Sequence, residues 1–139
     1  MRKLLQIIAG IILFSFTASA QPKGATTIIV KGVDYKMVTD AIMDNGYFIE
    51  NNNPDLGTAT TMERSYGNGV WLLIIQARVK DSTAYITGKI KVMLGPFGPP
   101  ELLSWDPVEN KGMKKSPLKL AFTELMKVAL SLNKPMEYK

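Results

Sequence analysis

One short pattern in the sequence has the spacing of a metal site. Asn51-x-Asn53-x-Asp55 places side-chain oxygens at alternating positions, as the start of a calcium-binding loop does. Such a loop also needs glycine at its sixth position and a bidentate acid at its twelfth, where this chain has Leu56 and Met62. The pattern therefore predicts a polar turn between two strands, not a metal site.

A second pattern has the spacing of a nucleophile and its base. Ser116 and Lys119 form S-x-x-K, which places an amine one helical turn from a serine in penicillin-recognising enzymes. The companion motifs S-D-N and K-T-G are missing, and 139 residues are too few for that fold. Because Pro117 follows Ser116 directly, the pair predicts the start of a helix, with Ser116 as its N-cap.

The remaining titratable residues suggest no catalytic arrangement. The chain has no cysteine and no histidine, which excludes disulfides, thiolate and imidazole ligands and Ser-His triads. Asp40 and Asp44 are four residues apart but fall on the polar face of an expected helix, where solvated carboxylates are not set up for acid/base catalysis. We therefore predict a protein that is not an enzyme and has no metal site and no cofactor.

The first twenty residues have the pattern of an export signal. Arg2 and Lys3 precede an apolar run from Leu4 to Phe16, and Ala18-Ser19-Ala20 offers small residues to a signal peptidase. The run is shorter than the roughly 20 apolar residues of a membrane span. We predict cleavage after Ala20, a periplasmic or secreted protein and no transmembrane span after cleavage. The alternative is a retained N-terminal anchor.

The charge of the chain argues against nucleic acid as a partner. The formal net charge is +5, and Arg2 and Lys3 of the expected signal supply two of these charges. The other lysines and arginines are not clustered as they are in nucleic-acid-binding domains. A mild positive charge suits weak attraction to anionic surfaces of the cell envelope.

From Gln21 to Lys139 the chain predicts a single domain of strands and helices. Five segments are rich in β-branched or alternating apolar residues and predict strands: Ala25 to Lys31, Tyr47 to Asn51, Thr58 to Tyr66, Val70 to Lys80 and Ala84 to Leu94. Helical spacing predicts one helix from Asp34 to Asn45 and another from Ser116 to about Asn133. The proline-rich segment 95–115 is expected to be irregular, and the tail from Lys134 to be frayed.

The two longest strands predict their own register. A hairpin centred on Asp81-Ser82 makes one face wholly apolar, with Val79 opposite Ala84 and Trp71 opposite Val92 at its two ends. A shift of one residue would destroy this separation. We expect the long C-terminal helix to pack on the apolar face.

The order β-α-β-β-β-β-α predicts an α+β fold, an antiparallel sheet with two helices on one face. This order resembles the TATA-binding-protein-like two-layer sandwich, and in particular small exported domains of unknown function that have it. The segments that carry the resemblance are GVDYKMVTDAIMDNGYFIE and ARVKDSTAYITGKI. The resemblance implies no catalytic motif, and it implies that the uncovered, concave face of the sheet is a binding surface.

The hairpin register also predicts which side chains lie on that uncovered face. They are aliphatic, polar and basic, an arrangement that suits a protein or an amphiphilic partner: Leu72, Ile74, Gln76, Arg78, Tyr85, Thr87, Lys89, Lys91 and Met93. No phenylalanine wedge of the kind that kinks DNA is placed on these strands. Two alternatives stay open: the proline-rich segment covers the face, or the face is an ordinary sheet surface.

Large apolar side chains in the proline-rich segment form a second candidate surface: Phe97, Leu102, Leu103 and Trp105. Loops with such residues often bind partners. The alternative is that they close one end of the core.

Together these observations predict an exported, non-catalytic binding or structural module that uses the sheet face and the proline-rich segment against a protein or envelope component. A carrier of a small apolar ligand, held between the sheet and the C-terminal helix, is the alternative.

Overall fold

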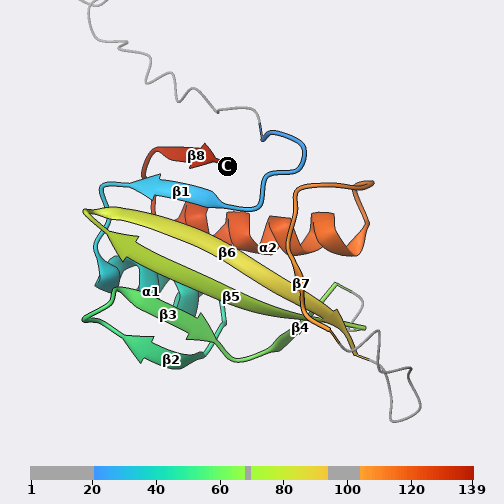
Figure 1. Cartoon of the computed structure of the whole chain (residues 1–139), viewed down its shortest axis with the longest axis horizontal. Coiled ribbons are helices and arrows are strands. Elements are labelled where there is room, and N and C mark those ends of the chain that lie inside the picture. The colour runs from blue at the N-terminus through green and yellow to red at the C-terminus, as the bar shows by residue number, and fades with distance from the viewer. Residues whose placement is uncertain (1–20, 68–69, 94–103) are drawn as a thin grey trace, which may run out of the picture.

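The computed structural model describes residues 21–67, 70–93 and 104–139 (Figure 1). The expected export signal, residues 1–20, lies outside the described residues. So do three of the proposed binding residues, Phe97, Leu102 and Leu103.

Two helices form where the sequence places their caps. Helix α1 (Tyr35–Asp44) starts after Asp34, whose Oδ1 accepts a hydrogen bond from the Met37 amide at 2.8 Å. Helix α2 (Pro117–Ser131) starts after Ser116, whose Oγ accepts from the Lys119 amide at 3.4 Å. Both caps satisfy amides that the first turn of a helix leaves free. Ser116 is therefore a capping residue, as predicted.

The strands form one antiparallel sheet: β1 (Ile28–Lys31), β2 (Ile49–Asn53), β3 (Thr58–Thr61), β4 (Arg64–Tyr66), β5 (Trp71–Lys80), β6 (Thr83–Val92), β7 (Asp106–Pro107) and β8 (Met136–Tyr138). The strand order is β2-β3-β5-β6-β1-β8, while β4 pairs with β5 and β7 with β6. The α+β class with an antiparallel sheet and two helices is confirmed.

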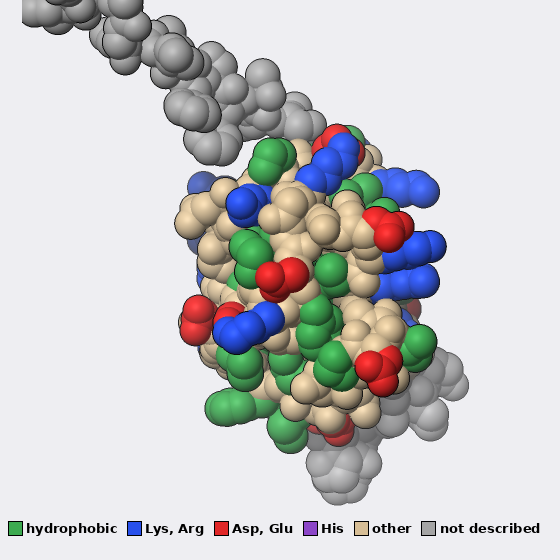
Figure 2. Space-filling model, turned by 90° about the vertical axis from the view of Figure 1, so that its left-hand side faces the viewer, with side chains coloured by type: hydrophobic (Ala, Val, Ile, Leu, Met, Phe, Trp, Pro, Cys, Tyr) green, Lys and Arg blue, Asp and Glu red, His purple; other side chains and the backbone are tan. Residues whose placement is uncertain are grey.

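The two helices lie on the same side of the sheet, and neither covers the side that faces the viewer in Figure 1. Figure 2 shows the surface of the molecule from the left-hand side of Figure 1. Lys and Arg side chains project there along the right-hand edge, which belongs to the uncovered face. The hairpin formed by β5 and β6 supplies the centre of this face.

The predicted register of that hairpin is confirmed along its whole length. Val79 pairs with Ala84 and Trp71 with Val92. Asp81 and Ser82 form the turn with φ of 51° and 57°, the left-handed conformation that two-residue hairpin turns require. The alternation of side chains along each strand thus fixes which ones face the helices.

The strand count differs from the prediction of five strands. The expected strand from Thr58 to Tyr66 is split, because Thr60 pairs with Gln76 and Arg64 with Leu73, which leaves one extra residue between them. Such a bulge bends a strand. The tail expected to fray instead forms β8 on the free edge of β1, and β7 extends the edge of β6.

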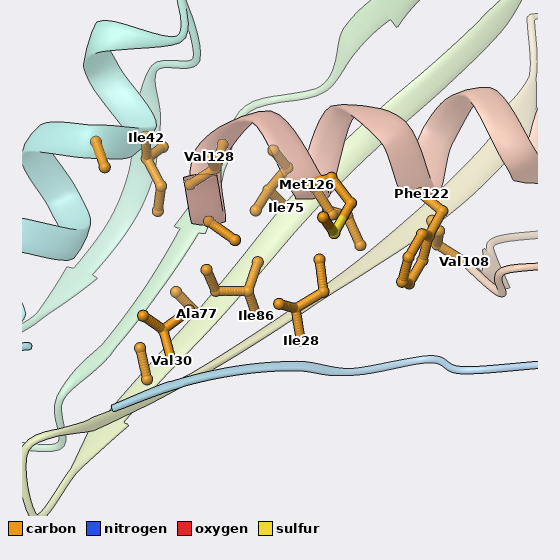
Figure 3. Packing of buried hydrophobic residues seen from close by; sticks show 14 of the residues in the cluster. Ile28, Val30, Ile42, Ile75, Ala77, Ile86, Val108, Phe122, Met126 and Val128 are labelled. Carbon is orange, nitrogen blue, oxygen red and sulfur yellow. The ribbon is translucent and has the colours of Figure 1, made fainter. Parts of the chain in front are cut away.

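The core lies between the sheet and the helices. Figure 3 shows Phe122, Met126 and Val128 of α2 pointing toward Ile28 of β1 and Ile86 of β6. Burying side chains of this size contributes about 1.5–3 kcal/mol each. Val108, from the proline-rich segment, is also part of this core, so that segment contributes to packing.

Candidate functional site

The uncovered face of β5 and β6 carries the predicted side chains in cross-strand rows. From one end of the hairpin to the other, the outward pairs are Arg78 with Tyr85, Gln76 with Thr87, Ile74 with Lys89, and Leu72 with Lys91. The face therefore divides into a polar half near the turn and a more apolar half at the other end.

Side chains in the apolar half are less exposed to solvent than predicted. Leu72 was expected to be exposed, but only 9% of its surface is exposed. It lies between Ser65 of β4 and Lys91 of β6. The Lys91 ammonium is held 4.5 Å from the centre of the Trp105 ring and 3.3 Å from Oε2 of Glu63. The expectation for Leu72 was wrong because alternation along a strand assigns a side chain to a face of the sheet but does not determine how much its neighbours bury it.

Trp105 therefore belongs to the sheet face. The prediction left open whether it binds a partner or closes the end of the core, and its contact with Lys91 places it half-buried on the outer side of the sheet. Met93, at the same end, stays exposed, whereas Ile74 is half-buried.

Two exposed apolar residues of this region were not predicted. The exposed fractions are 75% for Phe48 and 52% for Met62. The two residues are neighbours, since the Met62 amide donates to the Phe48 carbonyl at 2.8 Å. Their apolar character was visible in the sequence, but the bulge between β3 and β4 determines which way Met62 points.

The polar half contains a hollow of about 690 Å³. Hydroxyl and amide side chains line it: Thr26, Thr27, Thr58, Thr60, Thr87, Tyr85 and Gln76. Arg78, Lys80 and Lys139 add positively charged side chains, and Ala59 and Ala77 complete the lining. Its volume falls in the range of about 300–1,000 Å³ typical of ligand sites. Of the predicted surface, Gln76, Arg78, Tyr85 and Thr87 meet here.

Arg78 and Lys80 give the hollow a positive electrostatic character. No acidic side chain is among the described residues that line it. Elsewhere on the face, Lys31 pairs with Glu137 at 2.6 Å and Lys91 with Glu63, so their charges are compensated. Arg78 and Lys80 are exposed and form no ion pair with another described residue. An approaching anion is therefore attracted to this half.

A second hollow, of about 650 Å³, lies at the opposite end of the hairpin between the sheet and the start of α2. Apolar side chains supply much of its lining: Trp71, Ile90, Pro107, Pro117 and Leu118. Lys23, Asp106, Glu109 and Lys111 add charges to it. This is the region expected to hold an apolar ligand if the protein is a carrier.

Two tyrosines with shifted pKa values lie on the helix side of the sheet. Burial raises the pKa of Tyr47, and Glu124, which accepts a hydrogen bond from the Tyr47 hydroxyl at 2.9 Å, raises it further. Burial also raises the pKa of Tyr66, whose hydroxyl donates to the Pro117 carbonyl at 3.1 Å. Both phenols keep their protons at neutral pH, so neither acts as a base there.

We expect these tyrosines to make the protein sensitive to alkali. From about pH 10 upward the unfolded state loses the protons of Tyr47 and Tyr66 while the folded state keeps them. The free energy of unfolding should then fall as pH rises, by up to about 2.7 kcal/mol per pH unit for the pair. Below that pH both states are protonated, and the pair adds no pH dependence.

Urea unfolding at a series of pH values measures this effect. The double variant Tyr47→Phe/Tyr66→Phe should lose this part of the alkaline slope. An unchanged slope in the double variant would contradict the prediction.

The two sequence patterns with chemical spacing have structural roles. Asn53 Oδ1 accepts a hydrogen bond from the Leu56 amide at 3.1 Å, which stabilises the predicted turn. Across residues 21–67, 70–93 and 104–139, no three His, Cys, Asp or Glu side chains are grouped as metal ligands would be. In the same part of the chain no helix has the length and apolar character needed to cross a membrane.

Comparison with protein-family models gives no match, and comparison with curated proteins gives none either.

Proposed function

We propose that the chain is an exported, non-catalytic binding module whose uncovered sheet face binds a protein or a component of the cell envelope. The observation that carries this proposal is the hollow on that face, with its hydroxyl lining and its uncompensated Arg78 and Lys80. Export is supported by the charged and apolar pattern of residues 1–20. The proline-rich segment contributes Trp105 to the same face.

The proposal includes a relation to small exported domains with a TATA-binding-protein-like fold. A first strand, a short helix, consecutive antiparallel strands and a long C-terminal helix support it, while β7 and β8 are additional. In that fold the uncovered sheet face is the binding surface. The hollow of this chain lies on the corresponding face.

The proposal is tested by placing an acid at the centre of the face. Ile74 lies opposite Lys89, so an aspartate there gains an oppositely charged cross-strand neighbour and the fold should persist. We expect Ile74→Asp to reduce capture of envelope components by immobilised protein at least tenfold, because it removes apolar contact at the centre of the face. Quantitative capture from an isolated envelope fraction measures the loss.

The control is Leu130→Asp, which makes the same kind of change at an exposed position of α2 on the opposite side of the sheet. It should leave capture unchanged. If wild type and Ile74→Asp retain the same components in equal amounts, the sheet face is not the binding surface.

The hollow of about 650 Å³ beside Trp71 favours a carrier of a small apolar ligand as the second candidate function. In that case the protein purified from its source should carry a bound apolar molecule, visible by native mass spectrometry, and Ile74→Asp should not release it.

A further inference from the structure

We infer that the hollow on the uncovered face binds an acidic polysaccharide, with Arg78 and Lys80 on its acid groups and the threonine hydroxyls and Tyr85 on its sugar rings. This inference rests on the proposed function, because it names the ligand class of the same surface.

The cations identify the acid group. Arg78 and Lys80 lie two residues apart on β5, so both point to the same face of the sheet. Neither is compensated by a carboxylate within the described part of the chain, and both are exposed. A guanidinium binds a carboxylate or a phosphate through two parallel hydrogen bonds, and a lysine adds a second positive charge beside it.

The neutral lining identifies the rest of the ligand. The side chains of Thr58, Thr60, Gln76 and Thr87 form no hydrogen bond with another described group, so they are available to a ligand. A hydroxyl both donates and accepts hydrogen bonds, as sugar hydroxyls do. A lining of this kind matches a molecule covered with hydroxyl groups better than it matches an apolar side chain.

Tyr85 adds a flat apolar surface. It pairs with Arg78 across the hairpin and is 40% exposed. An exposed tyrosine ring combines a wide apolar face with a polar tip. The carbon-bound hydrogens of a sugar ring present a similarly flat apolar side, so a ring can pack on Tyr85 while its acid group reaches Arg78.

The geometry disfavours an acidic peptide and a membrane. Strands β3, β5 and β6 line the hollow and are all internal in the sheet order, so their backbone groups are engaged with neighbouring strands. An extended peptide usually adds to a free strand edge. A membrane surface is contacted by projecting apolar side chains, whereas hydroxyl, amide and cationic side chains line this hollow.

The inference is tested with polymers that separate charge from ring structure. Polygalacturonate has an acid on every sugar ring, poly-L-glutamate has the acids without rings, and dextran has the rings without acids. We expect the purified protein to bind polygalacturonate measurably more tightly than either of the others in titration calorimetry at low salt. Arg78→Gln/Lys80→Gln should weaken that binding about tenfold.

Two further variants separate the parts of the site. Lys114→Gln/Lys115→Gln removes the same amount of charge from two exposed positions outside the hollow and should change the affinity less than twofold. Tyr85→Ala should weaken polygalacturonate binding several-fold and leave any binding of poly-L-glutamate unchanged.

Three results would overturn the inference: equal binding of poly-L-glutamate, tighter binding of phosphatidylglycerol vesicles, or polygalacturonate binding that does not depend on Arg78 and Lys80. If polygalacturonate fails while Ile74→Asp still abolishes envelope capture, only the ligand class is wrong. If both fail, the proposed function is wrong as well.

Discussion

Replacing Gly57 with alanine should lower the free energy of unfolding by about 3 kcal/mol or more. Gly57 has a φ of +66°, and a Cβ atom added to it would lie 2.2 Å from the backbone oxygen of Val79. The Val79 amide also donates to the Gly57 carbonyl at 2.7 Å, so the two backbones cannot separate without losing this hydrogen bond. No rotation of a side chain relieves a clash between Cβ and backbone.

Gly24→Ala is the matched control. Gly24 also has a positive φ, of +86°, but nothing lies within 4 Å of the position of its Cβ. The free energy of unfolding of Gly24→Ala should fall by only about 1 kcal/mol, the cost of holding an alanine at positive φ. Urea unfolding of both variants separates the two contributions. Equal losses would show that the close approach to Val79 does not determine the effect of Gly57→Ala.

The same contact links stability to the candidate site. Gly57 directly precedes Thr58, which pairs with Arg78 across β3 and β5. Thr58 and Arg78 are both part of the hollow. A shift of Gly57 away from Val79 should therefore also displace Thr58 from Arg78, and we expect Gly57→Ala to weaken polygalacturonate binding even under conditions in which the variant is folded.

The central hairpin could be predicted from the sequence because its signals are local. Alternating side chains from Trp71 to Lys80 and from Thr83 to Val92 admit only one register that keeps an apolar face intact, and the turn at Asp81-Ser82 agrees with it. The same alternation placed Gln76, Arg78 and Tyr85 on one surface. This hairpin alone supplies half of the residues that line the hollow.

The other half depends on pairings between distant segments. Thr26 and Thr27 reach the hollow because β1 lies beside β6, and the amides of both residues donate to the Lys139 carbonyl. The three residues of β8 have too little pattern to predict a strand. The sequence does not predict Val108 as a core residue either, because a single valine in a proline-rich segment has no periodicity.

Val108→Asp is the second large effect that we expect. Val108 is 1% exposed, and its amide donates to the Gly88 carbonyl at 2.9 Å. Its side chain and that of Leu125 both lie 3.1 Å from the position of a Cβ on Gly88, and Figure 3 shows Val108 beside Phe122 in the core. A carboxylate there would be buried beside apolar groups without a partner. The free energy of unfolding should fall by about 4 kcal/mol or more, a large fraction of the roughly 5–15 kcal/mol that stabilises an ordinary domain.

Met113→Asp introduces the same charge five residues further along the same segment, where the side chain is 85% exposed, and should change the stability by less than about 0.5 kcal/mol. Circular dichroism and urea unfolding of the two variants therefore report whether the proline-rich segment is part of the core. If Val108→Asp were as stable as Met113→Asp, the segment would be separable from the fold. If instead only Val108→Asp unfolds, Trp105, three residues before Val108, is fixed beside Lys91 by the core itself. The apolar half of the candidate surface is then preformed before any partner arrives.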